Sequence, residues 1–189
     1  GFRLVRGRQK SRLDYQLESA VQTGETAGVD HLAWFTHASV GYTFDARWSP
    51  NVRVAWDYAS GDRDPNDGEN NRFNTLFGAR RFEYGPTGLY GAIARANVVS
   101  PELRFDWTPR LRGGTTRRWR GAWRRVDLES ARDGWAPAGV ADPSGAAGTH
   151  VGDQFETAVA LRWPERGLQF EVGAVRLEAG RFVRRASPA

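Results

Sequence analysis

Apolar and polar side chains alternate strictly along several segments of this 189-residue chain. In residues 12–22, for example, Leu13, Tyr15 and Leu17 fall on one face of an extended chain, and Asp14 and Gln16 fall on the other. No uninterrupted apolar run approaches the roughly 20 residues that a membrane-spanning helix needs. The alternation therefore predicts two-faced β-strands and excludes a membrane protein built from helices.

Six further segments show the same alternation, with apolar residues on one face and polar or charged residues on the other. They lie at residues 32–44, 51–58, 103–107, 118–124, 153–163 and 168–174. A shorter segment at residues 2–6 adds part of another strand. The pattern predicts an all-β protein with about seven or eight strands, each apolar on one side only.

The connections between these segments differ in length in a regular way. Three are short and carry Pro or Gly, at residues 45–50, 109–114 and 164–167. Three are longer and polar, at residues 23–31, 59–101 and 127–150. Barrels of bacterial outer membranes have short periplasmic turns and long external loops. We therefore expect residues 1–189 to form a single domain, an antiparallel up-and-down transmembrane β-barrel with these long loops outside the cell.

The number of strands is too small for a complete barrel of this kind. Bacterial single-chain barrels have an even number of strands and no open edge. The chain also begins Gly-Phe-Arg-Leu, with no initiator Met and no signal-peptide pattern, and its tail at residues 180–189 does not alternate. We expect an incomplete barrel, one part of a larger barrel.

A soluble β-barrel that binds a ligand would show the same alternation, with its apolar face as the core. The positions of the aromatic residues favour the membrane. Phe44, Trp48, Trp107 and Trp163 stand beside short connections, and Trp34 lies nearer to a long one. Two such girdles mark the two interfaces of a membrane-spanning barrel. The mean hydropathy of −0.60, low for a chain with 12% aromatic residues, agrees with apolar residues at alternate positions.

The charges favour an anionic partner. The chain has 27 Lys and Arg against 22 Asp and Glu, and Lys10 is its only lysine. Guanidinium groups bind carboxylates through paired hydrogen bonds. The alternation places six arginines on the polar face, which lines the lumen of a barrel: Arg53, Arg104, Arg118, Arg120, Arg124 and Arg162. We expect about half of them to pair with acids of neighbouring strands, and the run at 118, 120 and 124 to select anions.

Other kinds of site have less support. Asp62, Asp64, Asn66 and Asp67 resemble part of a calcium loop, but Phe73 stands where such a loop has its bidentate Glu. The three histidines lack metal-ligand spacing, so the sequence predicts no metal site, no cofactor and no enzyme activity. Arg and Trp interleave at residues 117–125, but the alternation separates them onto opposite faces, which argues against nucleic-acid binding.

Several short motifs resemble those of the alginate export family. Trp56-Asp-Tyr-Ala-Ser-Gly-Asp62 looks like its strand-to-loop signature, and Ser130-Ala-Arg-Asp133, Gly148-Thr-His-Val-Gly152 and Gly180-Arg-Phe182 agree with it. The resemblance implies a monomeric barrel, surrounded by lipid of the bacterial outer membrane, that passes an anionic polysaccharide such as alginate. A general anion-selective porin is the alternative function. The motifs leave open which saccharide is carried and in which direction.

Overall fold

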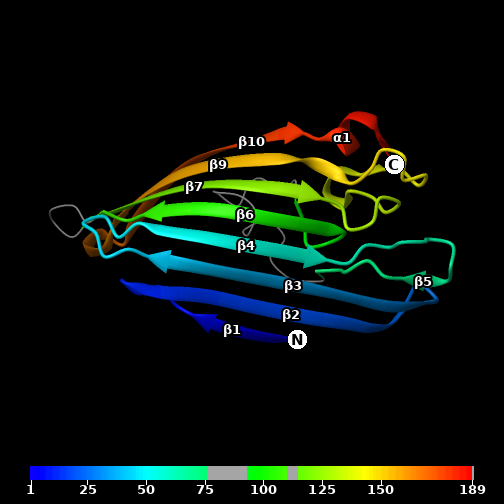
Figure 1. The fold of residues 1–189 in the computed structure, drawn as a ribbon, viewed down its shortest axis with the longest axis horizontal. Helices are drawn as coiled ribbons and strands as arrows, with labels where there is room; N and C mark the ends of the chain where they lie inside the picture. Colours follow the sequence, from blue (N-terminus) through cyan, green and yellow to red (C-terminus); the bar gives the residue numbers. More distant parts are fainter. Residues whose placement is uncertain (76–92, 110–114, 189) are drawn as a thin grey trace.

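The computed structural model describes residues 1–75, 93–109 and 115–188. Within them nine strands form one sheet, whose long strands follow one another in chain order and pair antiparallel with their neighbours (Figure 1). These long strands are β1 (Phe2–Arg6), β2 (Arg12–Thr26), β3 (Val29–Thr43), β4 (Asn51–Ala59), β6 (Val98–Trp107), β7 (Thr116–Asp127), β9 (His150–Trp163) and β10 (Leu168–Ala179). The predicted all-β, up-and-down fold is confirmed.

Shorter elements decorate the connections. Strand β5 (Glu69–Asn70) pairs in parallel with β3, and β8 (Val140–Ala141) forms a two-stranded sheet with β11 (Ser187–Pro188). The 3-10 helices η2 (Ala136–Ala138) and η3 (Pro164–Arg166) precede β8 and β10, and α1 (Arg181–Arg185) follows β10. In the part of the chain that the structure describes, no helix is long and apolar enough to span a membrane.

The sheet is open within the described residues. Strands β1 and β10 each pair on one side only and do not meet each other. The sheet has one end with short turns, between β3 and β4 and between β9 and β10, and one end with the long β4–β6 and β7–β9 connections (Figure 1). We call these the short-turn end and the long-loop end. An open, antiparallel sheet agrees with the predicted incomplete barrel.

The hairpin between β2 and β3 corrects one prediction. Residues 23–31 are not a long loop, because the ladder continues to Thr26, which pairs with Val29. Only Ala27 and Gly28 form the turn, and both have positive φ angles, 54° and 84°. Such two-residue turns match the twist of a hairpin. The polar residues 23–31 are thus the ends of two long strands and the turn between them. Each strand has 15 residues, more than the roughly 10 that cross a membrane.

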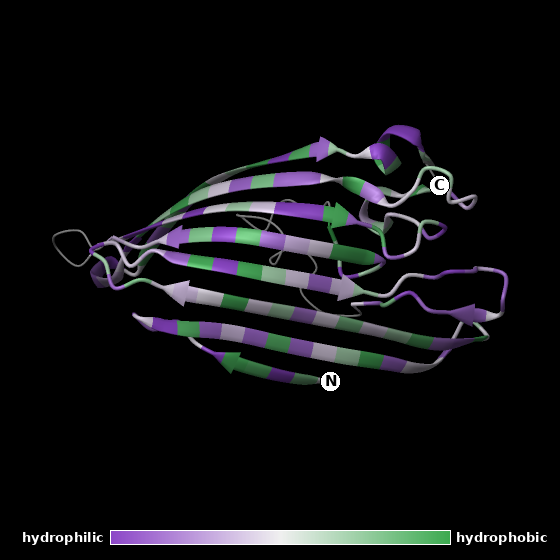
Figure 2. Cartoon of the chain, in the orientation of Figure 1, coloured by the Kyte–Doolittle hydropathy of each residue, from purple (hydrophilic) through white to green (hydrophobic). Residues whose placement is uncertain are grey.

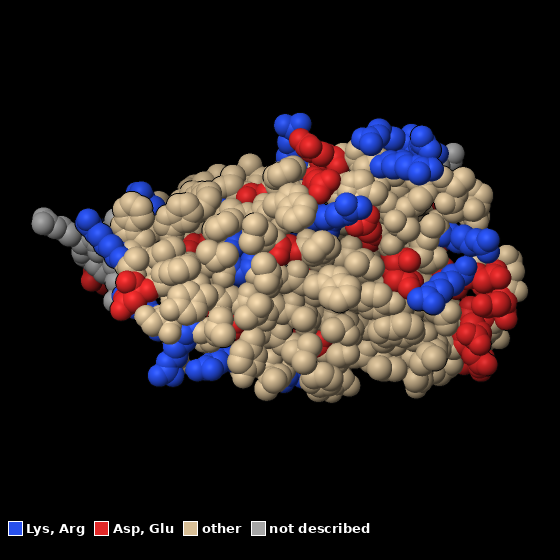
Figure 3. Space-filling view, in the orientation of Figure 1, with Lys and Arg blue, Asp and Glu red and all other residues tan. Residues whose placement is uncertain are grey.

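Burial of the two faces of the sheet is the reverse of that in a soluble protein, where the apolar face is buried and the polar face is exposed. Large apolar side chains are exposed on one face, as at Val21 (61%), Trp56 (54%) and Phe170 (56%), whereas Asp14 and Gln154 on the other face are fully buried. Figure 2 shows the alternation along each strand, and Figure 3 shows a largely uncharged middle with charges gathered at both ends. A broad exposed apolar band between charged rims is typical of a transmembrane barrel.

A small apolar cluster closes the long-loop end of the polar face. Phe35 and Val126 contribute to it from the strands, and Phe73, Leu128 and Phe182 contribute from the connections and α1. These loops are thus held against the sheet by buried apolar contacts, which fixes the shape of this end.

One buried amide ties two of the long connections together. Asn97 accepts a hydrogen bond from the Ser130 backbone N–H at 2.7 Å and donates to the backbone oxygens of Ser130 and Gly134 at 3.1 and 3.3 Å. Its own backbone N–H donates to the Ser60 oxygen at 3.2 Å. The β4–β6 and β7–β9 connections therefore form one hydrogen-bonded unit at the long-loop end.

Candidate functional site

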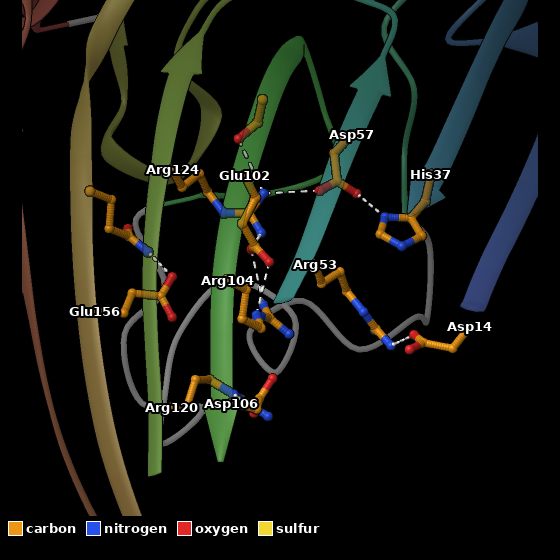
Figure 4. Close-up of polar contacts among 12 residues, drawn as sticks. Asp14, His37, Arg53, Asp57, Glu102, Arg104, Asp106, Arg120, Arg124 and Glu156 are labelled. Carbon is orange, nitrogen blue, oxygen red and sulfur yellow. Dashed lines mark hydrogen bonds and ion pairs between the residues drawn. The ribbon is translucent and has the colours of Figure 1, made fainter. Parts of the chain in front are cut away.

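Charged side chains from β2, β4, β6 and β7 meet on the polar face of the sheet (Figure 4). Alternation puts them there, because every second residue of a strand points to the same face. Five of the six arginines predicted for this face have an acidic side chain within 4.0 Å, more than the half expected from the sequence. The five are Arg53, Arg104, Arg118, Arg120 and Arg124.

Arg124 lies at the centre of the site and is almost fully buried, with 2% of its surface exposed. Its guanidinium group donates to Asp57 Oδ2 at 2.9 Å, to Ser100 Oγ at 3.1 Å and to the carboxylate of Glu102. Asp57 in turn lies 2.7 Å from His37 Nδ1. Strands β3, β4, β6 and β7 are thus linked by a single polar network.

A second pair crosses an intervening strand. Arg53 on β4 contacts Asp14 on β2, and Gly41 of β3 is the register partner of both. A Cβ atom at Gly41 would lie 2.9 Å from each carboxylate oxygen of Asp14. The absence of a side chain at this glycine therefore makes room for the ion pair. Asn51 supports it, because its Nδ2 donates to Asp14 Oδ2 at 2.9 Å.

A third group lies toward the short-turn end. Asp106 is 3.4 Å from Arg120 Nε and 2.8 Å from Arg8 Nη2, which comes from the β1–β2 connection. Asp106 is 2% exposed, so its charge is buried between the two arginines. Buried carboxylates need such partners because losing water is costly.

Two arginines are held less tightly. Arg118 Nη2 lies 4.0 Å from Glu171 Oε2, and 44% of its side chain is exposed. Arg162 on β9 is exposed, and no carboxylate of the described residues forms an ion pair with it within 4.0 Å. Its register partners on the neighbouring strands are Thr116 and Gln169. These two arginines have the most freedom to bind an added anion.

The arginines become more accessible toward the short-turn end of β7. Side-chain exposure rises from 3% at Arg124 to 23% at Arg120 and 44% at Arg118. Glu102 also contacts Arg104, with 2.8 Å between its Oε1 and Arg104 Nε. Glu102 and Asp106 therefore each contact two arginines. A carboxylate added at this face would meet several guanidinium groups that are paired two to one acidic side chain.

Sequence analysis missed two charged members of the site, Glu102 and Arg8. Glu102 precedes Arg104 by two residues and so shares its face, but it lies between Pro101 and the start of the predicted segment 103–107. Pro101 did not exclude Glu102 from the strand, because a proline is tolerated within a strand where its missing N–H leaves no partner unsatisfied. Arg8 could not be found by alternation, because it reaches the polar face from a connection.

The four candidate calcium ligands form an ordinary polar turn. Asp64 accepts the backbone N–H of Asn66 at 3.2 Å, and Asp67 accepts that of Glu69 at 2.9 Å. The backbone N–H of Asp62 donates to Asp133 at 3.0 Å. Among the described residues, no group of three or more acidic or histidine side chains is placed to hold a metal ion. The carboxylates of Asp64 and Asp67 thus bond to backbone N–H groups of their own loop.

Fold and site together define a class of protein. An antiparallel up-and-down sheet with an exposed apolar face and a buried, charged opposite face is the wall of a transmembrane β-barrel. The family model for alginate export matches residues 1–189, the whole chain. The chain therefore belongs to the alginate export family, a family of outer-membrane proteins for polysaccharide transport. No curated protein and no solved structure matches the chain.

Proposed function

We propose that the protein passes an anionic polysaccharide such as alginate across the bacterial outer membrane, through a lumen lined by arginines. The arginines are Arg53, Arg104, Arg118, Arg120, Arg124 and Arg162. Lipid would surround the exposed apolar face of a monomeric barrel. The carboxylates of a uronic acid polymer would then travel along the polar face.

The burial of charge on one face is the observation that carries this proposal. Asp57, Glu102 and Arg124 are buried on a face that alternation makes polar, while the opposite face exposes aliphatic and aromatic side chains. A soluble ligand-binding barrel would have these faces reversed, with its apolar face as the core. The observed arrangement supports a polar interior surrounded by lipid.

The arginines of β7 supply a gradient of binding strength. Arg124 is committed to Asp57 and Glu102, whereas Arg118 is the most exposed of the three. A pore must bind its cargo well enough to admit it and weakly enough to release it. Arginines that are already partly neutralised by wall carboxylates meet both conditions, because they attract an anion without holding it at full strength.

Ion selectivity in planar lipid bilayers, measured on the complete barrel that contains these strands, tests the proposal. The protein is compared with a variant carrying Arg118→Gln and Arg120→Gln, and with the control Arg176→Gln. Arg176 is 78% exposed and pairs with Glu178 at 3.0 Å on the opposite face of β10. We expect anion-selective current, a lower chloride-to-potassium permeability ratio in the double variant, and no change in the control.

Added oligouronate separates an exporter from a general anion porin. Block of the current by oligouronate at concentrations where neutral dextran has no effect supports polysaccharide transport. Anion selectivity without such block supports the porin. A complete, folded barrel containing these strands that carries no current in the bilayer contradicts the channel in either form.

A further inference from the structure

Helix α1 projects three arginines at the long-loop end of the sheet. The helix follows β10 directly, and Gly180 makes the sharp turn between them, with its backbone N–H donating to the Val151 oxygen at 2.6 Å. A Cβ atom at Gly180 would lie 2.3 Å from the His150 backbone oxygen. Only glycine allows the chain to approach β9 this closely. The turn therefore fixes where α1 begins.

One apolar residue anchors the helix. Phe182 is fully buried in the apolar cluster that closes the long-loop end of the polar face. Val183 and Ala186 pack against the same cluster. Helix α1 is thus docked on the side of the sheet that carries the proposed lumen. The Gly180-Arg-Phe182 motif supplies both the turn and the anchor, a role that sequence analysis did not assign.

The three arginines occupy neighbouring positions on the helix surface. Arg184 and Arg185 stand three and four residues after Arg181, which places the Cβ atom of each about 5–6 Å from that of Arg181. All three are exposed, and Figure 3 shows a group of basic side chains at the position of α1 in Figure 1. In the described residues none of them forms an ion pair with a carboxylate within 4.0 Å, unlike Arg124 inside the site. These three residues are the mouth arginines.

The contacts that the mouth arginines do make leave donors available. Arg181 Nη2 donates to the Ala146 backbone oxygen at 3.1 Å, and Arg184 donates to that of Ala179. A guanidinium group has five N–H donors, so these bonds orient the groups without saturating them.

A hollow lies beside the mouth arginines. It has a volume of about 430 Å³ and is lined by Arg185, residues 141–144, Ala146 and Ala147. Its one carboxylate, Asp142, accepts hydrogen bonds from the backbone N–H groups of Ser144 and Ala147, at 3.1 and 2.6 Å, and from Ser144 Oγ at 2.6 Å. Asp142 is therefore occupied by its own loop, and Arg185 remains available to a ligand.

We infer that the mouth arginines and the adjoining hollow form a second binding site, which holds carboxylates of the anionic polysaccharide at the long-loop mouth of the channel. The inference rests on the proposed function for the identity of the ligand. Three exposed guanidinium groups that form no ion pair among the described residues fit a chain with repeated carboxylates, because each group can bind one carboxylate at a time.

Phosphate groups of membrane lipid are the competing ligand. The docking of α1 favours the polysaccharide, because Phe182 attaches the helix to the cluster on the polar face. The lipid-facing side of the sheet is the opposite one, where Phe170 and Val172 of β10 are exposed. A site on the polar side meets the cargo rather than the surrounding bilayer.

Binding of a fluorescent oligouronate to the full protein in detergent tests the site without requiring conduction. The triple variant Arg181→Gln, Arg184→Gln and Arg185→Gln is compared with Arg176→Gln, an exposed arginine that already has a partner. Three exposed ion pairs of ordinary strength predict affinity weaker by roughly threefold to a hundredfold in the triple variant. The control keeps its affinity, and added salt reduces the difference. Unchanged tryptophan fluorescence shows that the variant is folded.

Two results would overturn the inference. Equal oligouronate affinity of the folded triple variant and the protein excludes a site at the mouth arginines. If the triple variant no longer binds vesicles that contain phosphorylated lipid but binds oligouronate as well as the protein does, the arginines bind lipid instead. Conductance is recorded on the same preparations. Normal selective current with unchanged oligouronate affinity rejects the mouth site alone, whereas absent current with intact binding rejects the channel alone.

Discussion

Replacing Arg124 by Gln should destabilise the protein far more than the same change at Arg118. Arg124 is buried and bonds to both Asp57 and Glu102, so its removal leaves two buried carboxylates without their shared partner. Breaking a buried ion pair by removing one side costs about 3–5 kcal/mol. His37 still contacts Asp57 and Arg104 still contacts Glu102. We therefore expect the lower part of that range, about 3 kcal/mol.

The change at Arg118 gives the matched comparison. Its side chain is 44% exposed and lies 4.0 Å from Glu171, a geometry whose contribution is below about 1 kcal/mol. Unfolding in urea, followed by tryptophan fluorescence in detergent micelles, measures both variants. A loss of about 3 kcal/mol lowers the folding equilibrium constant by about two orders of magnitude.

A compensated variant shows whether the buried charges are the cause. Adding Asp57→Asn and Glu102→Gln to Arg124→Gln removes the uncompensated carboxylates and should recover part of the lost stability. The reasoning is refuted if Arg124→Gln leaves the urea midpoint unchanged. Equal destabilisation by Arg118→Gln and Arg124→Gln would refute it as well.

Three further predictions concern single positions. Gly41→Ala should weaken the Asp14–Arg53 pair and cost about 1–3 kcal/mol of stability, measured by urea unfolding; an unchanged midpoint contradicts the crossing pair. Gly180→Ala should displace α1 and speed trypsin cleavage at its arginines, and an unchanged cleavage rate would show that the turn tolerates a Cβ atom. Burial, with the nearby charges of acids in the same loop, raises the pKa of Asp62, so the stabilisation from this carboxyl group is present in acid and lost as pH rises. Asp62→Asn should therefore be more stable than the protein at neutral pH and equally stable in acid. Equal urea midpoints at pH 7 would argue against this prediction.

Alternation was sufficient to predict the strands because it depends only on which face each residue points to. Leu13, Val54 and Phe170 lie on the exposed apolar face, as the alternation along residues 12–22, 51–58 and 168–174 predicts. Strand ends were harder to predict, because a polar hairpin such as residues 23–31 has the composition of a loop. There, pairing across the two-residue turn at Ala27 and Gly28 decided the structure.

The ion pairs of the site could be predicted only in part. Opposite charges on neighbouring strands suggested pairing, but the partners depend on a register that spans several strands. Arg124 illustrates this, because Asp57 is on β4, two strands away from β7. Gly41 shows the same limit, since its role is visible only when Asp14 and Arg53 are known to lie on either side of it.

The sharing of carboxylates between two cations has a consequence for motion along the wall. Glu102 and Asp106 each contact two arginines, so in the proposed channel an arginine that turns toward a passing carboxylate would exchange one such partner for another. The fixed acid keeps its second arginine during the exchange. In the proposed channel, the energy of the polymer would change little from one position to the next, and small steps rather than escape from one deep minimum would limit its speed. A polar wall built in this way would let a charged chain move along it without high energy barriers between neighbouring positions.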